Sequence, residues 1–243
     1  MKELSIIIPI LNEGKNIKIL IPKINNIKKK LNLKKFEVIL VDDDSSDNTI
    51  NIVKNLQKKF KYLKIFYRKN LSKDLSKSCI LGFNKSLYNN LLVMDGDLQH
   101  HPKYIILMFN LLHKTNSDLV IGCRDLFREN KGLSYFRRSF SLILIYLINI
   151  LLGNKTLDPM SGFFIFKKKI FLKNKHNLYG KGYKILADII YSSRHKLLIN
   201  DLYINFDRRK KGKSKMSFKI LIILISFMIN RFIKNTLQKK FFY

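Results

Sequence analysis

The 243-residue chain has little cysteine, proline or glycine. Its two cysteines, Cys79 and Cys123, show neither CxxC spacing nor another metal-ligand spacing, so they predict buried free thiols rather than a metal site. The four prolines and ten glycines do not gather into a stretch that would mark a linker. The simplest division is therefore one domain at 1–216, followed by a basic and apolar tail at 217–243.

Acidic residues are also scarce. The chain has 17 Asp and Glu against 47 Lys and Arg, which gives a formal net charge of +30 at pH 7. Such a charge suits an anionic partner: nucleic acid, a phosphorylated substrate or an anionic membrane. Lys, Asn and Ile are frequent throughout, as an AT-rich genome would produce, so only charges at particular positions carry weight. A basic nucleic-acid-binding protein is the weaker alternative, because no helix-turn-helix, zinc or RNP signature is present.

Apolar runs long enough to span a membrane are missing as well. The stretch 139–154 is uncharged over 16 residues and 220–229 is apolar over ten, whereas a span needs about 20. The second run lies within 207–243, which holds 11 Lys and Arg, and this composition is typical of an interfacial helix. The flanking basic residues are then expected to face anionic headgroups: Lys213, Lys215, Lys219, Arg231, Lys234, Lys239 and Lys240.

The start of the sequence indicates where in the cell the protein is expected. The apolar run at 4–8 is too short for a signal peptide and is followed by Pro9. Together with the tail, this predicts a protein on the cytoplasmic face of a membrane, either peripheral or monotopic.

Hydrophobic periodicity predicts that strands and helices alternate. Strands are expected at 4–8, 36–41, 63–67, 91–94, 119–123, 163–166 and 197–202, and helices at 17–31, 49–60, 76–86, 104–114, 135–152 and 184–193. This alternation predicts an α/β fold with a mostly parallel sheet and helices on both faces.

The most informative motif follows the strand expected at 91–94. It reads Asp95-Gly96-Asp97, with Gln99 two residues further on. In parallel sheets, ligands bind outside the carboxyl ends of the strands. Carboxylates at i and i+2 point the same way on an extended backbone, and Gly96 would let the backbone approach a ligand. One or two carboxylates plus substrate phosphates commonly hold Mg²⁺, although Asp and Gly are also ordinary turn residues. His100 and His101, which come next, are interpreted as loop residues.

A second acidic cluster, Asp42-Asp43-Asp44, ends the strand expected at 36–41. A carboxylate in this place often accepts hydrogen bonds from the ribose or base of a nucleotide. After the first strand, however, residues 8–13 contain no glycine to seat a pyrophosphate, which disfavours a dinucleotide enzyme.

Several motifs occur in a characteristic order. They are Ile-Ile-Pro-x-x-Asn-Glu at 7–13, Val-Asp-Asp-Asp-Ser at 41–45, Met-Asp-Gly-Asp-Leu-Gln-His at 94–100, Gly-Cys-Arg at 122–124, Arg-Arg-Ser-Phe-Ser at 137–141, Asp-Pro-Met-Ser-Gly-Phe at 158–163, Gly-Tyr-Lys-Ile-Leu at 182–186 and Arg-Lys-Lys-Gly-Lys-Ser-Lys at 209–215. This set resembles the family 2 glycosyltransferases of GT-A fold, and among them the polyprenyl (dolichyl) phosphate mannose synthases. The resemblance covers about residues 4–216 and implies a GT-A, Rossmann-like sheet.

The resemblance also implies roles for individual residues. It places a divalent metal, Mg²⁺ or Mn²⁺, and the donor diphosphate on Asp95, Asp97 and Gln99. It lines the nucleotide pocket with Pro9, Leu11, Glu13, Val41, Asp43 and Gly96, and surrounds the donor phosphates with Arg124, Lys184, Arg209 and Lys215. Arg137 matches an arginine near the acceptor phosphate, with Arg138 as the second candidate, and Asp97, Arg124 and Arg137 are the implied catalytic residues.

The sequence departs from the family pattern at three positions. Leu11 stands where tyrosine is usual, Asp74 where glycine is usual, and Gly96 where alanine is usual. Asp74 is therefore expected either to alter the local backbone or to cap the next helix.

The implied reaction is inverting transfer of mannose from GDP-mannose to a polyprenyl phosphate. The acceptor phosphate is largely dianionic at neutral pH, so it needs no general base, and cations are what the reaction requires. A UDP-glucose or other UDP-sugar transferase is the alternative. Such relatives often carry two long C-terminal membrane helices, unlike the ten-residue run at 220–229.

Overall fold

The fold is built on a seven-stranded sheet with the order β3-β2-β1-β4-β6-β5-β7. The computed structural model describes residues 2–124, 144–150, 152–182, 184–193, 195–206 and 225–233. β6 runs antiparallel to β4 and β5, and the other neighbouring strands pair in parallel. The strands are β1 (Glu3–Ile10), β2 (Lys35–Asp42), β3 (Leu63–Tyr67), β4 (Asn90–Val93), β5 (Leu119–Arg124), β6 (Phe164–Lys167) and β7 (Ile199–Ile204).

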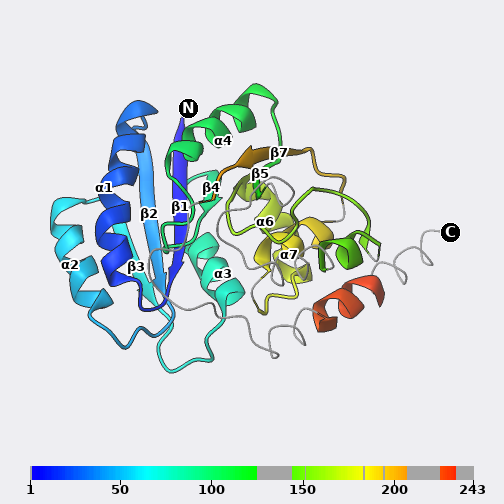
Figure 1. Ribbon diagram of the computed structural model, residues 1–243, viewed down its shortest axis with the longest axis horizontal. Coiled ribbons are helices and arrows are strands. Elements are labelled where there is room, and N and C mark those ends of the chain that lie inside the picture. Colours follow the sequence, from blue (N-terminus) through cyan, green and yellow to red (C-terminus); the bar gives the residue numbers. More distant parts are fainter. Residues whose placement is uncertain are drawn as a thin grey trace.

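Helices cover both faces of this sheet (Figure 1). They are α1 (Gly14–Lys30), α2 (Thr49–Lys59), α3 (Leu75–Lys85), α4 (Lys103–Lys114), α6 (Lys168–Asn174) and α7 (Ile185–Ser192), with further helical residues at 144–150 and 225–233. One apolar core lies between the sheet and α1, α2 and α4, and a second lies between the sheet and α3, α6, α7 and the helices at 144–150 and 225–233. Ile6 and Ile8 of β1 enter the first core and Ile7 the second, as the alternation of side chains along a strand requires.

This architecture confirms the predicted α/β class, the mostly parallel sheet and all seven strands. Two features differ from the expectation. The short helix α6 was not predicted, and β6 interrupts the parallel order. Of the helix predicted at 135–152, the structure describes 144–150 and residue 152, and the rest lies outside the described residues.

The helix at 225–233 buries the side chains of Phe227 and Met228, both 4% exposed, in the core that also contains α7. Arg231 is also buried and pairs with Asp188 of α7 at 2.9 Å. The expectation that Arg231 faces lipid headgroups is therefore wrong. The other basic residues expected to do so, at 213, 215, 219, 234, 239 and 240, lie outside the described residues. No helix in the described part of the chain is long and apolar enough to cross a bilayer.

Candidate functional site

The loop after β4 carries the predicted metal ligands at the carboxyl edge of the sheet. Asp95 is about one third exposed, at 36% of its side chain, whereas Asp97 is 2% exposed. The Oδ1 atom of Asp97 accepts a hydrogen bond from the backbone N–H of Gln99 at 3.1 Å. Leu98 between them has φ +66°, a left-handed conformation that costs a leucine about 1–3 kcal/mol. The loop is thus held in one strained shape that presents Asp95 and packs Asp97.

His100 closes this loop, and its role was missed by the sequence interpretation. Its Nδ1 accepts a hydrogen bond from the backbone N–H of Asp95 at 3.1 Å, and its Nε2 lies 4.0 Å from Oδ2 of the same residue. The ring stacks on Phe163 at 4.9 Å and meets the edge of Phe206 at 5.0 Å. Burial, with a contribution from Arg124, lowers the pKa of His100 to about 4, so the ring is neutral, as an accepting Nδ1 requires.

Two glycines of the motifs face different surroundings. A Cβ added to Gly162 would lie 2.8 Å from Oδ2 of Asp95, so the missing side chain leaves room for this carboxylate. A Cβ added to Gly96 would instead meet Ile10 and Ile17 at 3.2 and 3.3 Å. A side chain at Gly96 would therefore enter the core, and the approach of the Gly96 backbone to a ligand stays a prediction.

We expect Gly162→Ala to weaken metal-dependent activity by about tenfold, because the new methyl group must displace the Asp95 carboxylate. Gly96→Ala is the matched control, since its methyl group presses only on Ile10 and Ile17 and should lower stability by about 1 kcal/mol. Mn²⁺ titrations of activity, with melting temperatures, distinguish the two effects. Equal metal dependence in both variants would show that Gly162 does not make room for a ligand group.

Arg124, at the end of β5, lies on the same edge. Its Nε donates to Oδ2 of Asp158 at 3.1 Å, and its guanidinium lies 5.6 Å from the centre of the Phe206 ring. Burial opposes its charge, but the pairing with Asp158 outweighs this and raises the pKa of Arg124. Because the side chain keeps 20% exposure, part of this cation faces the open edge.

Lys184 precedes α7 and is half-buried. It makes no ion pair with another described side chain. Burial and the nearby Arg124 lower its pKa to about 8, although Asp158 and Asp95 act in the opposite direction. A cation held beside another cation, without an ion-pair partner among the described side chains, is well suited to a phosphate.

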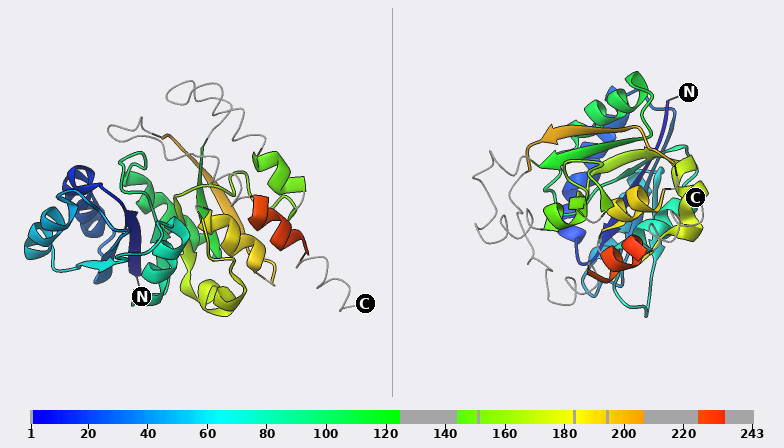
Figure 2. Two further views of the ribbon diagram at one scale, coloured as in Figure 1. Left: turned by 90° about the horizontal axis from the view of Figure 1, so that it is seen from below. Right: turned by 90° about the vertical axis from the view of Figure 1, so that its right-hand side faces the viewer.

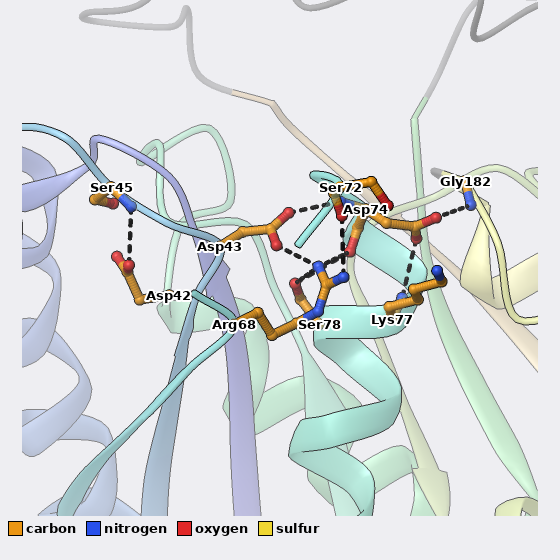
Figure 3. Close-up of polar contacts among 9 residues, drawn as sticks. All are labelled: Asp42, Asp43, Ser45, Arg68, Ser72, Asp74, Lys77, Ser78 and Gly182. Carbon is orange, nitrogen blue, oxygen red and sulfur yellow. Dashed lines mark hydrogen bonds and ion pairs between the residues drawn. The ribbon is translucent and has the colours of Figure 1, made fainter. Parts of the chain in front are cut away.

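The acidic cluster after β2 forms a network with β3 and α3 (Figure 3). Arg68 pairs with Oδ1 of Asp43, and the backbone N–H of Asp74 donates to Oδ2 of Asp43 at 2.7 Å. Burial raises the pKa of Asp43, which the Asp74 N–H and Arg68 partly offset. Oδ1 of Asp42 accepts from the Ser45 N–H at 2.9 Å, while its buried Oδ2 has no hydrogen-bond partner in the described part of the chain. The structure thus compensates most of the repulsion among these carboxylates.

Asp74 has the helix-capping role that was one of its two predicted roles. Its side chain accepts from the Lys77 N–H at 3.0 Å at the start of α3, and from the Gly182 N–H at 2.8 Å (Figure 3). Its φ of −156° is ordinary extended backbone, so no glycine is needed here. Asp74 therefore joins the loop before α3 to the loop before α7.

The remaining predicted residues are distributed around this edge. Pro9 lies near the end of β1, and Leu11 and Glu13 follow it, with Oε2 of Glu13 accepting from Asn16 at 2.6 Å. Val41 is fully buried on the α3 side of β2, so its side chain belongs to the core. The structure brings Asp95, Asp97, Gln99, Arg124 and Lys184 to one edge, whereas Arg137, Arg138, Arg209 and Lys215 lie outside the described residues.

The donor atoms of the loop after β4 suit a hard divalent cation. In the described part of the chain, no three His, Cys, Asp or Glu side chains are grouped to hold a metal ion. Mg²⁺, however, is usually held by one or two carboxylates together with substrate phosphates and water. Asp95, Asp97 and the Gln99 amide can each supply oxygen ligands, and the missing side chain of Gly162 leaves room for the Asp95 carboxylate. The residues present therefore fit such an ion.

A sheet with carboxylates and cations at its carboxyl edge suits a phosphorylated ligand, and comparisons with known proteins give the family. Residues 5–174 match the model of glycosyl transferase family 2, and the chain belongs to this family. It is 32% identical over 226 residues to a dolichol-phosphate mannosyltransferase of Pyrococcus furiosus, covering 90% of this chain and 60% of that protein. It is 29% identical over 227 residues to a Saccharomyces cerevisiae protein of the same name, covering 90% and 83%.

Solved structures agree with this fold. The glucosyl-3-phosphoglycerate synthase of Mycobacterium tuberculosis, in complex with Mn²⁺, UDP-glucose and phosphoglyceric acid, matches with a TM-score of 0.71. The match covers 95% of this chain and 80% of that one at 17% sequence identity. At this identity the likeness establishes the GT-A architecture alone.

Proposed function

We propose that the chain is a metal-dependent inverting hexosyltransferase that moves mannose from GDP-mannose to a polyprenyl phosphate of the dolichyl type. The names of its relatives support the substrate class. One feature of the site carries the proposal: the partly exposed carboxylate of Asp95 lies close enough to the cations Arg124 and Lys184 to favour the charged form of both. Such an edge can hold two phosphorylated substrates and a divalent cation.

The side chains have distinct tasks in this reaction. The acceptor phosphate is already a dianion near neutral pH, so the site needs no base to activate it. Arg124 and Lys184 would stabilise the charge that develops on the departing nucleoside diphosphate. Asp95, Asp97 and Gln99 would hold Mg²⁺ or Mn²⁺, which when bound supplies further neutralisation of that charge. His100 would keep Asp95 in place through its backbone N–H.

A nucleotide panel tests the donor. With Mn²⁺ present, GDP should bind more tightly than UDP in titration calorimetry, and GDP-mannose should give a labelled polyprenyl-phosphate sugar. Preference for UDP and transfer from UDP-glucose would replace the donor assignment by its alternative. Binding of neither nucleotide, together with salt-dependent DNA binding, would favour the nucleic-acid alternative.

The pKa of Lys184 predicts how donor affinity depends on pH. Below a pKa of about 8 the free enzyme carries the charge, and the charge is lost as the pH rises through that value. GDP affinity, measured with Mn²⁺ between about pH 7 and pH 9.5, should therefore fall above about pH 8. Lys184→Arg should remove this decline, because arginine stays charged. A wild-type curve that stays flat would show that Lys184 does not contact the donor.

We further propose that the protein attaches to the cytoplasmic surface of a membrane. The helices at 144–150 and 225–233 lie at one end of the molecule beside α7 (Figures 1 and 2). Both have exposed apolar side chains: Tyr146, Leu147 and Ile150 on the first, and Ile225, Ile229, Phe232 and Ile233 on the second. Apolar helix faces in a chain of charge +30 suit an anionic bilayer.

We expect the double variant Ile229→Ser and Phe232→Ser to bind vesicles containing anionic lipid about tenfold more weakly, because each loses apolar surface that would enter the bilayer. Leu107→Ser is the matched control, since Leu107 is 51% exposed on α4, across the sheet from α7. Flotation with vesicles measures the membrane binding of the double variant and of the control. An equal loss in the control, or no loss in the double variant, would contradict attachment through this surface.

A further inference from the structure

The segment from Asn177 to Gly182, which leads to Lys184, is held at both ends. At the C-terminal end of the segment, Gly182 donates its N–H to Asp74 at 2.8 Å, and its carbonyl accepts from the Ser76 N–H at 2.8 Å. These two bonds fix the segment to the start of α3, and through Asp74 to the network of Asp43 (Figure 3). Gly180 and Gly182 both have positive φ, so the chain turns sharply between its two attachments.

Closer to its N-terminal end, the segment is held by Asp188 of α7. The Oδ1 atom of Asp188 accepts from the Tyr179 N–H at 3.0 Å, and its Oδ2 accepts from the Gly180 N–H at 2.7 Å. Ser192 adds a third hydrogen bond, to Oδ1, at 2.8 Å. A carboxylate that is 3% exposed therefore organises the backbone immediately before Lys184.

Arg231 of the C-terminal helix completes this arrangement. Its guanidinium pairs with Asp188 at 2.9 Å and also donates to the backbone carbonyl of Asn177. Phe227, one turn earlier, packs against Tyr179 with ring centres 6.0 Å apart. Arg231 is 2% exposed and its Nε has no hydrogen-bond partner among the described residues, so the fold keeps a guanidinium buried at a cost.

We propose that Arg231 is a positioning residue, which ties the C-terminal helix to the segment at 177–182 and so fixes Lys184 at the donor-phosphate edge. The opposite face of this helix carries the apolar residues that we assign to the membrane. Attachment to a membrane and order at the phosphate edge are thereby joined through one buried ion pair. The link between the helix and the segment follows from the contacts, whereas the donor and the membrane rest on the proposed function.

The first experiment follows the segment itself, whatever the donor is. In full-length Arg231→Met, the amide hydrogens of Tyr179, Gly180 and Gly182 should exchange about tenfold faster than in the wild type. Lys64→Met is the matched control, because it removes a surface partner of buried Glu37 at 2.7 Å without touching the segment. Unchanged exchange at 177–182 in Arg231→Met, or equal acceleration there in Lys64→Met, would overturn the proposal.

The second experiment separates positioning from stability. GDP binding with Mn²⁺ should weaken about tenfold in Arg231→Met, while the KM for the polyprenyl phosphate stays within about twofold. The double variant Arg231→Met with Asp188→Asn removes both charges, so its melting temperature should recover while its GDP affinity stays low. Arg231→Lys should regain part of the affinity, because its ammonium can reach Asp188.

The outcomes show whether the positioning role of Arg231 or the proposed donor is wrong. Full recovery of GDP affinity in the double variant would show that Arg231 only stabilises the fold, and would overturn its positioning role. If the wild type binds UDP in place of GDP, the proposed donor fails, and the same comparison of variants is read with UDP. Faster exchange at 177–182 together with weaker nucleotide binding supports the coupling in either case.

Discussion

Asp97→Asn should fold as the wild type does and lose about a thousandfold of its turnover, which corresponds to about 4 kcal/mol of transition-state stabilisation. Asparagine keeps an oxygen that can accept the N–H of Gln99, so the loop after β4 should retain its shape. What the variant loses is a negative charge beside the proposed cation and the donor diphosphate. Turnover at saturating Mn²⁺, with circular dichroism and a melting curve, measures both effects.

A neighbouring carboxylate provides the control. Asp44 belongs to the cluster after β2 and has φ +69°, a conformation that asparagine adopts readily. Asp44→Asn should therefore keep activity within about threefold of the wild type. Activity of Asp97→Asn above about a tenth of wild type would remove the metal-binding role assigned to Asp97.

Local sequence patterns predicted most of the architecture. Each strand is a short apolar run, because strands covered by helices on both faces bury both sets of side chains. The direction of β6 could not be predicted, since an apolar run such as Phe163–Phe166 is the same for either direction of pairing. The direction shows only in the antiparallel pairing of β6 with β4 and β5, which is a tertiary contact and not a matter of periodicity.

The sequence predicted those site residues whose charged side chains lie at or just after the end of a strand. Arg124 ends a buried strand, Asp95 and Asp97 follow one within a few residues, and parallel strands end at one edge. Asp158 was part of a quoted motif, but its pairing with Arg124 joins residues 34 positions apart. The contact of His100 with Phe163, and the bond from Gly182 to Asp74, likewise connect distant segments. Such contacts leave no local pattern in the sequence.

The tail shows how composition alone can mislead. Arg231 belongs to a basic segment and was expected to face lipid, yet the structure buries it against Asp188. The useful signal was the isolated Asp188 within the apolar helix α7, because a carboxylate in such surroundings requires a cation or several N–H donors. Here it has both, and the cation comes from the C-terminal helix.

Arg124→Gln should lower kcat/KM by about a hundredfold, equivalent to about 2.7 kcal/mol, and should also destabilise the fold. The loss of activity follows from removing a cation at the edge where the diphosphate departs. The loss of stability follows from leaving Asp158, which is 1% exposed, without its charged partner, at about 3–5 kcal/mol. Kinetics well below the melting temperature keep the two effects apart.

Two further variants show which effect dominates. Arg124→Lys keeps the charge but not the planar group that donates to Asp158, so we expect activity between wild type and Arg124→Gln. Arg124→Gln combined with Asp158→Asn should recover most of the stability, because no unpaired charge is then buried. Its kcat should stay low, since the cation that faces the substrates is still missing. If kcat recovers together with stability, Arg124 is a structural partner of Asp158 and the departing diphosphate is stabilised by other residues.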